Sequence, residues 1–304
     1  MTAAAALSET ILRSGARRVA FLGLAKNVGK TTALVAVLGE LHRAGVATGT
    51  TSAGRDGESF DAITGEAKPR FRVFPGQLVA SASSTYASAS FKTAAVQTLP
   101  FSTRFGLIEI RRAEGEGEIE MIGPSTASQM ADTAAALEFA GAGRVLIDGA
   151  IGRRAFACAR VADAIVLSVG MAAAESLDGA LGIARAASEL IRLPAARPGA
   201  RAREIQGALT ELWLDENSVA PGDTLVAEDF TAIFLPPARR TKLREAGVHL
   251  AVRRTARLLA LTSNPTAPAR PPLPAARLFE ALERGFPETP VFDLGADLWS
   301  GQPA

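Results

Sequence analysis

The chain has 304 residues, of which 48% are hydrophobic and 21% charged, and its 33 Lys and Arg against 31 Asp and Glu give a formal charge of +2. This composition is typical of a globular protein with a substantial core, and it excludes a mostly disordered chain. The basic residues form scattered pairs and no basic stripe, so sequence-independent binding of nucleic acid is not indicated. A single cysteine, Cys158, excludes an internal disulfide framework and any metal centre built from several thiolates.

The N-terminal segment and the apolar runs indicate the compartment. Residues 1–18 contain Glu9 and Arg13 and no long apolar stretch, so we expect a short helix there and no signal peptide. The longest weakly polar run, residues 164–174, is too short to span a bilayer. Together with the low cysteine content, these features lead us to expect a cytoplasmic protein that does not insert into a membrane.

The first sixth of the chain has the pattern of a strand, a turn, a helix and a second strand. Residues 19–22 are an apolar run that predicts a strand, and residues 46–52 predict another. Between them, residues 29–44 carry leucines and a valine at helical spacing, and Gly45 ends this predicted helix. This order predicts an α/β protein with a mostly parallel sheet flanked by helices.

Further elements follow the same kinds of pattern. Alternating residues at 105–111 and 118–122, with glycines between them, predict a hairpin. Residues 194–199 have the composition of a linker, and five prolines exclude regular structure at 265–274. The remaining predicted strands are 71–73, 145–147, 164–167, 232–235, 249–252, 258–262 and 291–292, and the remaining predicted helices are 128–140, 175–193 and 275–283.

The sharpest motif is Gly-Leu-Ala-Lys-Asn-Val-Gly-Lys-Thr-Thr at residues 23–32, between the first strand and the first long helix. Successive backbone N–H groups in such a loop form a concavity for phosphate, reinforced by the helix dipole. We expect Lys30, on a solvent-facing loop, to reach the terminal phosphates, and Thr31 to offer its hydroxyl to Mg²⁺. The alternative is a glycine turn with incidental lysines. The predicted phosphate-binding residues are Lys26, Asn27, Val28, Gly29, Lys30, Thr31 and Thr32.

Acidic residues after two other strands are candidate metal and catalytic groups. Asp148 ends an apolar run before Gly149, as expected of a residue that holds Mg²⁺, although a turn or cap residue would have the same pattern. Asp56 follows the second strand and is a candidate for holding a metal-bound water or acting as general base. Arg55 beside it is a candidate phosphate contact. An ordinary charged turn is the alternative for both.

Two polar segments and the cysteine have competing interpretations. Asn264 follows a predicted strand at an expected sheet edge, where its amide is suited to pair with adenine; an Asn-Pro turn is the alternative. Residues 125–129 are either a nucleotide-sensing loop or an N-capped helix start. Cys158 lies in an alanine-rich stretch without a glycine-rich elbow, so we expect a buried hydrophobe and no nucleophile.

The chain resembles two related groups of proteins. The G-x5-G-K-T spacing and the Asp148-Gly149-Ala150 turn are similar to those of dethiobiotin synthetase and of the cobyrinic-acid and cobyric-acid synthases. From about residue 18 to 293 the chain resembles the P-loop subunit of lysine 5,6-aminomutase reactivase. The segments that carry this second resemblance are Gly23–Thr32, Gly54–Glu58, Thr64–Pro69, Ile122–Ser125, Asp148–Ala150 with Arg153, Gly207–Thr210 and Asn264–Pro265.

The resemblance implies a single P-loop NTPase domain over residues 1–304, with a core at about 18–193 and 254–293 and an insertion at about 200–253. It implies an ATPase that uses ATP and Mg²⁺, with Lys30, Asp56 and Asp148 as catalytic residues and Thr31, Asp56 and Asp148 at the metal. Its work would be to release damaged cobalamin from an adenosylcobalamin-dependent aminomutase, so the expected partner is that enzyme or a second reactivase subunit.

Two alternatives remain open at this point. One is a ligase similar to dethiobiotin synthetase that acts on a small carboxylate or carbamate, and the other is a nucleotide-gated binding module. The absence of an Asn-Lys-x-Asp motif from the sequence favours ATP over GTP.

Overall fold

The computed structural model describes residues 1–53, 55–56, 71–150, 158–197, 199, 201–268 and 270–301. Of Arg55, Asp56 and Ala150 it describes the backbone alone. The predicted segments Thr64–Pro69 and Gly57–Glu58, together with Arg153, therefore lie outside the described residues.

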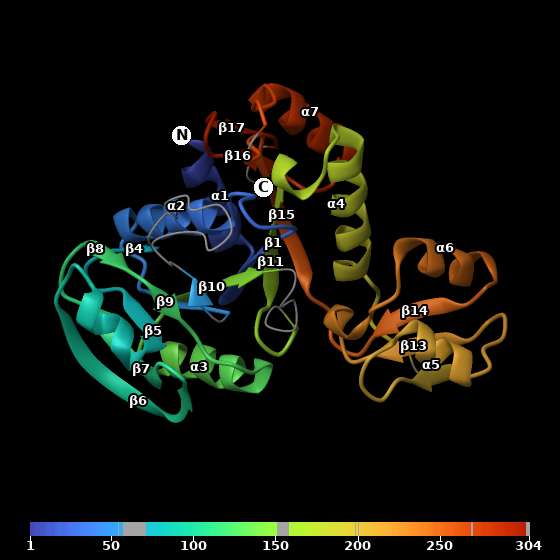
Figure 1. Cartoon of the computed structure of the whole chain (residues 1–304), viewed down its shortest axis with the longest axis horizontal. Helices are drawn as coiled ribbons and strands as arrows, with labels where there is room; N and C mark the ends of the chain where they lie inside the picture. Colours follow the sequence, from blue (N-terminus) through green and yellow to red (C-terminus); the bar gives the residue numbers. More distant parts are fainter. Residues whose placement is uncertain are drawn as a thin grey trace.

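A large sheet forms the centre of the fold (Figure 1). Within the described ranges it has ten strands in the order β17-β16-β15-β11-β1-β10-β2-β5-β7-β6. The seven strands from β16 to β5 run parallel, and antiparallel strands lie at both edges. This confirms the predicted α/β class with a mostly parallel sheet. The strands are β1 (Arg18–Gly23), β2 (Thr48–Ser52), β5 (Leu78–Ala82), β6 (Thr93–Thr103), β7 (Gly106–Ala113), β10 (Arg144–Ala150), β11 (Ala164–Gly170), β15 (Arg257–Asn264), β16 (Val291–Asp293) and β17 (Leu298–Trp299).

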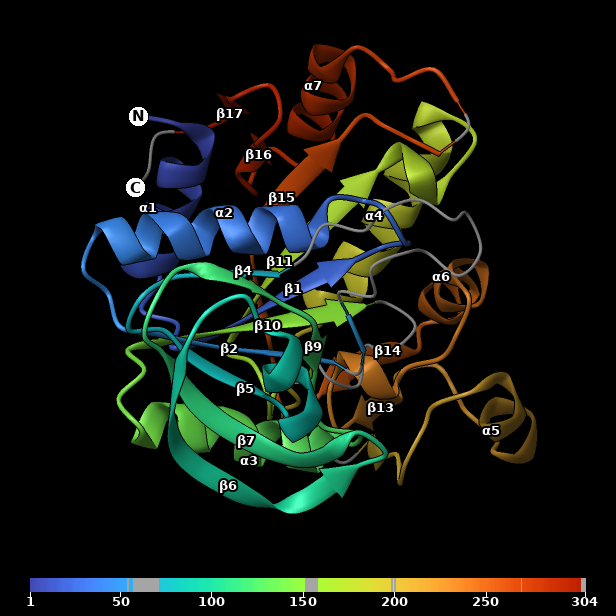
Figure 2. The same cartoon turned by 60° about the vertical axis from the view of Figure 1, so that its left-hand side comes forward.

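Helices cover both faces of this sheet, as Figure 2 shows for α2 and α3. Successive side chains of a strand point to opposite faces, and β1 follows this rule. Val19 and Phe21 pack in the core cluster of α1 (Ala3–Arg13) and α2 (Lys30–Arg43). Ala20 and Leu22 pack on the other side. That second cluster contains α3 (Ala127–Phe139), α4 (Leu177–Ile191) and α7 (Ala275–Gly285).

All five of these helices were predicted from the sequence, and the structure confirms them. No helix in the described part of the chain combines the length and the apolar character that crossing a membrane requires.

Residues between α4 and β15 form a separate, smaller unit beside α4 (Figure 1). Its parallel strands β12 (Ala202–Glu204), β13 (Thr224–Ala227) and β14 (His249–Val252) form a sheet of their own. Two short helices, α5 (Glu211–Glu216) and α6 (Pro237–Glu245), accompany them. Phe230 and Leu235 of this unit belong to the same core cluster as α4, so the unit packs on the helical layer.

One predicted pairing and one predicted strand are wrong, although residues 105–111 and 118–122 do lie largely in strands. Residues 105–111 and 118–122 do not pair with each other, because β7 pairs with β5 and β6. The later residues form β8 (Gly117–Ile119), which pairs with β4 (Phe71–Val73), and β9 (Met121–Ile122), which pairs with β3 (Arg55–Asp56). Residues 232–235 are not a strand; a short 3₁₀ turn at Phe230–Ala232 and one bridge at Ile233 take their place.

Candidate functional site

The candidate phosphate loop joins β1 to α2 in the middle of the large sheet. β1 lies between β10 and β11 and runs parallel to both, so the loop leaves the sheet at the edge where the strands end. Asn27 and Gly29 have φ values of 60° and 83°, in the left-handed region. Gly29 is the N-cap of α2 and supplies no side-chain cap, so the first turn of the helix begins without one.

Asp148 is the centre of the polar contacts behind this loop. Its side chain is fully buried in β10, and it forms an ion pair with Lys30 through Oδ1. The Thr31 hydroxyl donates to the other carboxylate oxygen at 2.9 Å. The register places Asp148 between Phe21 of β1 and Ser52 of β2. One carboxylate from a neighbouring strand therefore binds the first two residues of α2.

Two expectations about this cluster need correction. Lys30 does not lie on a solvent-facing loop, because it begins α2 and its side chain is only 12% exposed. The ion pair with a buried carboxylate draws its ammonium group inward. Asp148 does not end its strand, because β10 continues to Ala150. Of the other predicted phosphate-binding residues, Lys26, Asn27 and Thr32 are exposed, whereas Val28 is buried.

The ends of β11 and β15 support the loop from the other side. The backbone N–H of Leu24 donates to the Ser168 carbonyl at 3.2 Å. Gly170 lies against Val28 so closely that a Cβ at Gly170 would be 3.0 Å from the Val28 Cα atom. This contact explains why a glycine stands at the end of β11. The side-chain amide nitrogen of Asn264 donates to the Asn27 carbonyl at 3.0 Å.

Asn264 therefore contacts the loop itself. Its amide oxygen accepts from the N–H and the hydroxyl of Thr266, at 3.1 and 2.8 Å. β15 lies inside the sheet between β11 and β16, so Asn264 is not at a sheet edge as expected. The amide is engaged within the protein, and its pairing with adenine stays a prediction. The bond to the loop depends on two segments far apart in sequence, so the sequence carried no signal for it.

The segment after β2 begins beside Asp148. The Ala53 N–H donates to the Asp148 carbonyl at 2.7 Å. Arg55 and Asp56 then pair with Ile122 and Met121 as a short antiparallel ladder. Their side chains lie outside the described residues, so their predicted roles stay predictions. Gly123, directly after this ladder, lies against Ser52, where a Cβ would be 1.7 Å from the Ser52 carbonyl oxygen.

Residues 125–129 are the N-capped start of α3. The Thr126 hydroxyl accepts from the Gln129 N–H at 3.2 Å, and the Gln129 side chain accepts from the Ser125 N–H at 3.2 Å. The first bond satisfies a donor in the first turn of the helix, and the second satisfies the donor of the residue that precedes the cap. The structure thus has the cap that one of the two interpretations requires, and a nucleotide-sensing role of this segment stays a prediction. Cys158 is buried as expected.

The arrangement offers a defined set of groups to a ligand. An uncapped helix start and a lysine are suited to anions. The Thr31 hydroxyl and the Asp148 carboxylate, one behind the other, are the oxygen ligands that hard cations prefer. Comparisons of the chain with protein-family models, with curated proteins and with solved structures give no match.

Proposed function

We propose that the chain is a Mg²⁺-dependent P-loop ATPase that binds ATP at residues 24–32. The observation that supports this most is the contact of the buried Asp148 with both Lys30 and Thr31. Removing an ion pair from water costs free energy that its own attraction rarely exceeds, so a buried pair contributes little net stability. Stability alone therefore does not account for the ion pair of Lys30 and Asp148. Its position at the start of a helix and at the carboxyl ends of parallel strands favours a role in ligand binding.

Each residue has a role in this proposal. Backbone N–H groups of the loop and of the first turn of α2 bind the phosphates, and Lys30 turns from Asp148 to the phosphate oxygens. Thr31 and Asp148 would hold Mg²⁺ through their oxygen atoms. The cation supplies neutralisation of the charge that develops on the phosphates. Asp56 orients the attacking water, and Arg55 contacts phosphate; both roles rest on their sequence position after β2.

The resemblance to the reactivase subunit extends the proposal to a partner. ATP binding would favour the state that binds an inactivated, adenosylcobalamin-dependent aminomutase, and hydrolysis to ADP and phosphate would reset it. A ligand shifts such an equilibrium only by its difference in affinity for the two states. The nucleotide must therefore bind more tightly when the partner is present, because the coupling is reciprocal.

Titration calorimetry with MgATP tests the nucleotide site. We expect saturable binding to the wild-type protein, a loss of at least about tenfold in affinity for Lys30→Ala, and no change for the exposed Lys92→Ala. Wild-type protein that binds no MgATP, or a Lys30→Ala variant that binds as tightly as Lys92→Ala, would overturn the P-loop assignment.

Measurements of phosphate release distinguish the proposed partner-dependent ATPase from a ligase and from a nucleotide-gated binding module. Hydrolysis is measured with the protein alone, with small carboxylates, and with a cobalamin-dependent aminomutase. Stimulation by the aminomutase is the expected result. Release that depends on a small carboxylate would instead support a ligase, and MgATP binding without turnover in any mixture would leave a nucleotide-gated binding module.

A further inference from the structure

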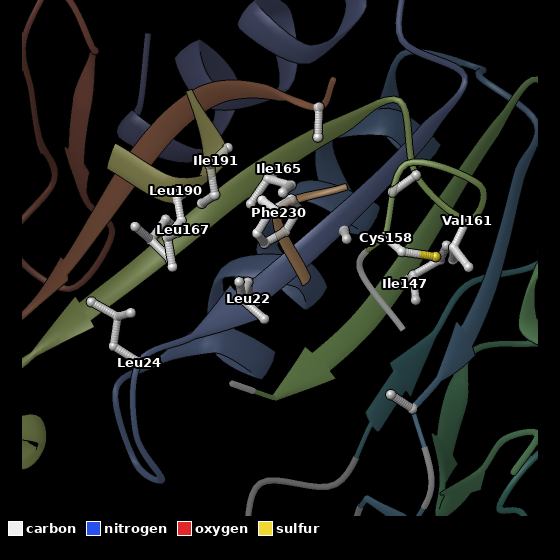
Figure 3. Packing of buried hydrophobic residues seen from close by; sticks show 14 of the residues in the cluster. Leu22, Leu24, Ile147, Cys158, Val161, Ile165, Leu167, Leu190, Ile191 and Phe230 are labelled. Carbon is white, nitrogen blue, oxygen red and sulfur yellow. The ribbon is translucent and has the colours of Figure 1, made fainter. Parts of the chain in front are cut away.

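An apolar cavity of about 350 Å³ lies between α4, the end of β1 and the smaller unit. Its walls include Leu22 of β1, Ile183, Ala187 and Leu190 of α4, and Phe230 of the smaller unit. Figure 3 shows Phe230 over the strands, with Leu190 and Ile191 beside it and Leu22 below. Such a volume is within the range of ligand pockets.

Space remains at the α4 wall of this cavity. Gly182, an exposed residue in the middle of the α4 sequence, lines it, and a Cβ at this position would have no atom within 4 Å apart from its chain neighbours and the backbone of α4. Glycine inside a helix costs about 1 kcal/mol relative to alanine. The structure therefore keeps an unfavourable helix residue where a larger one would meet no obstacle in the protein itself.

A second cavity, of about 530 Å³, adjoins the first and differs from it in charge. The two share Leu190 and Arg240 in their walls. The second is also lined by Arg197, Arg244 and His249, and Glu189 is the acidic residue among its lining residues. The second cavity is thus lined by three guanidinium groups and one carboxylate, and it lies beside an apolar cavity.

The positive charge of this second cavity is only partly compensated. The Arg240 side chain is 9% exposed; it donates to the Ala186 carbonyl at 2.9 Å and lies 3.5 Å from Glu189. Burial lowers the pKa of Arg240, and Glu189 offsets part of this shift. Arg197 and Arg244 form no ion pair with any residue in the described part of the chain. An anion from solution would therefore find unpaired donors there.

We propose that these adjoining cavities bind a small amphiphilic anion, with its apolar body between α4 and Phe230 and its carboxylate or phosphate head group at Arg197 and Arg244. The guanidinium fork matches the geometry of both head groups. The walls of the apolar cavity contain none of the residues 24–32, so this ligand and ATP occupy different places. Leu22 nevertheless belongs to the strand that leads into the loop.

Octanoate is the probe, with octanol and octylamine as neutral and cationic matches of the same chain length. Titration followed by NMR is expected to give saturable one-to-one binding of octanoate to the full chain, with octanol weaker by about tenfold and octylamine not bound. The double variant Arg197→Gln/Arg244→Gln should bind octanoate with about tenfold lower affinity and bind octanol with the same affinity as the wild type. Arg284→Gln, an exposed arginine on α7, is the matched control and should change neither.

A filling variant tests the apolar part separately. Ala187→Leu places a larger side chain on the partly exposed wall of the cavity and should abolish binding of both octanoate and octanol, while MgATP binding stays intact and reports that the variant is folded. If the variant has lost MgATP binding, the dispersion of its amide signals in the NMR spectrum shows instead whether it is folded. The proposal is overturned if octanoate does not saturate, if octanol binds as well as octanoate, or if the double arginine variant binds octanoate like wild type.

Discussion

The side-chain amide of Asn264 donates a hydrogen bond of 3.0 Å to the backbone carbonyl of Asn27, across 237 residues of sequence. Asn27 has a φ of 60°, a left-handed conformation that residues other than glycine adopt at a cost in free energy. The bond from the end of β15 stabilises this conformation. The shape of the candidate phosphate loop therefore depends on a strand near the end of the chain as well as on its own residues.

Replacing Asn264 by Ala should weaken MgATP binding by about fivefold, the equivalent of one hydrogen bond of about 1 kcal/mol. The reason is that the unbound loop samples more conformations once the bond to Asn27 is lost. Thr266→Val is the control, because it removes a hydroxyl that donates to Asn264 but leaves the bond to Asn27 in place. Equal affinities for Asn264→Ala and wild type in calorimetry would show that the loop keeps its shape without this bond.

The ion pair of Lys30 and Asp148 predicts a specific pattern in stability. Lys30→Ala leaves the buried carboxylate without its cation, which should lower the free energy of unfolding by about 3 kcal/mol in urea. The double variant Lys30→Ala/Asp148→Asn removes both charges and should regain most of that loss. It should still bind MgATP poorly, because the lysine is gone. A double variant as unstable as Lys30→Ala would mean that the lost contact, and not the unpaired charge, causes the destabilisation.

Asp148→Asn alone should separate metal binding from phosphate binding. The amide keeps the shape of the carboxylate but loses the charge that holds the cation, so Mg²⁺-dependent hydrolysis should fall by about 10–100-fold. Nucleotide binding measured in EDTA should change little, because Lys30 and the loop remain. Similar losses with and without Mg²⁺ would assign Asp148 a structural role only.

The approach of Gly123 to Ser52 predicts that no larger residue fits there. A Cβ 1.7 Å from the Ser52 carbonyl oxygen cannot be accommodated unless the backbone moves. Gly123→Ala should therefore lower the free energy of unfolding by about 3 kcal/mol. Gly115→Ala is the matched control: its Cβ would have nothing within 4 Å, and the change should stay within about 0.5 kcal/mol. Urea unfolding of the two variants side by side decides whether the contact is as tight as described.

The buried thiol of Cys158 predicts a dependence of stability on pH. Burial, followed by the nearby Asp229, raises the pKa of Cys158. A folded-state pKa above the unfolded value of about 8.5 stabilises the fold below that pH, and this stabilisation is lost as the pH rises. The difference in unfolding free energy between wild type and Cys158→Ala should therefore shrink between about pH 7 and about pH 9.5. A constant difference would mean that the thiol is as solvated in the folded chain as in the unfolded one.

Local patterns predicted the elements around β1 well. The apolar run of β1 and the helical spacing in α2 are properties of consecutive residues, and the structure has both elements within one or two residues of the prediction. Strand pairing was harder. Alternation in β7 shows that one of its faces is buried, but the choice of β5 and β6 as partners depends on residues elsewhere.

Two strands of the sheet gave too weak a signal. β5 consists largely of small residues, which have no marked preference for strands. β6 contains Pro100, and its sequence lacks the alternation of apolar and polar residues expected of a strand. In the structure much of its length is exposed. β6 is an edge strand and is recognised from β7, the one strand of the sheet that it pairs with in the described part of the chain.

Some contacts of the candidate site could also be predicted from the sequence, and others could not. The loop and Asp148 could be assigned to one site because strand ends of a parallel sheet meet at one edge, and the structure brings Thr31 and Asp148 to 2.9 Å. The contacts of Asn264 with Asn27 and of Gly123 with Ser52 depend on the packing of distant segments. Sequence patterns of a single chain do not contain that information.

The strand order also has a consequence for the growing chain on the ribosome. β1 is made early, but its neighbours β10 and β11 follow more than a hundred residues later, and β15 comes after the smaller unit. Contacts that span such separations form slowly, since the loop between them must close first. The strand that begins the loop therefore cannot complete its native pairing until more than half of the polypeptide has been synthesised.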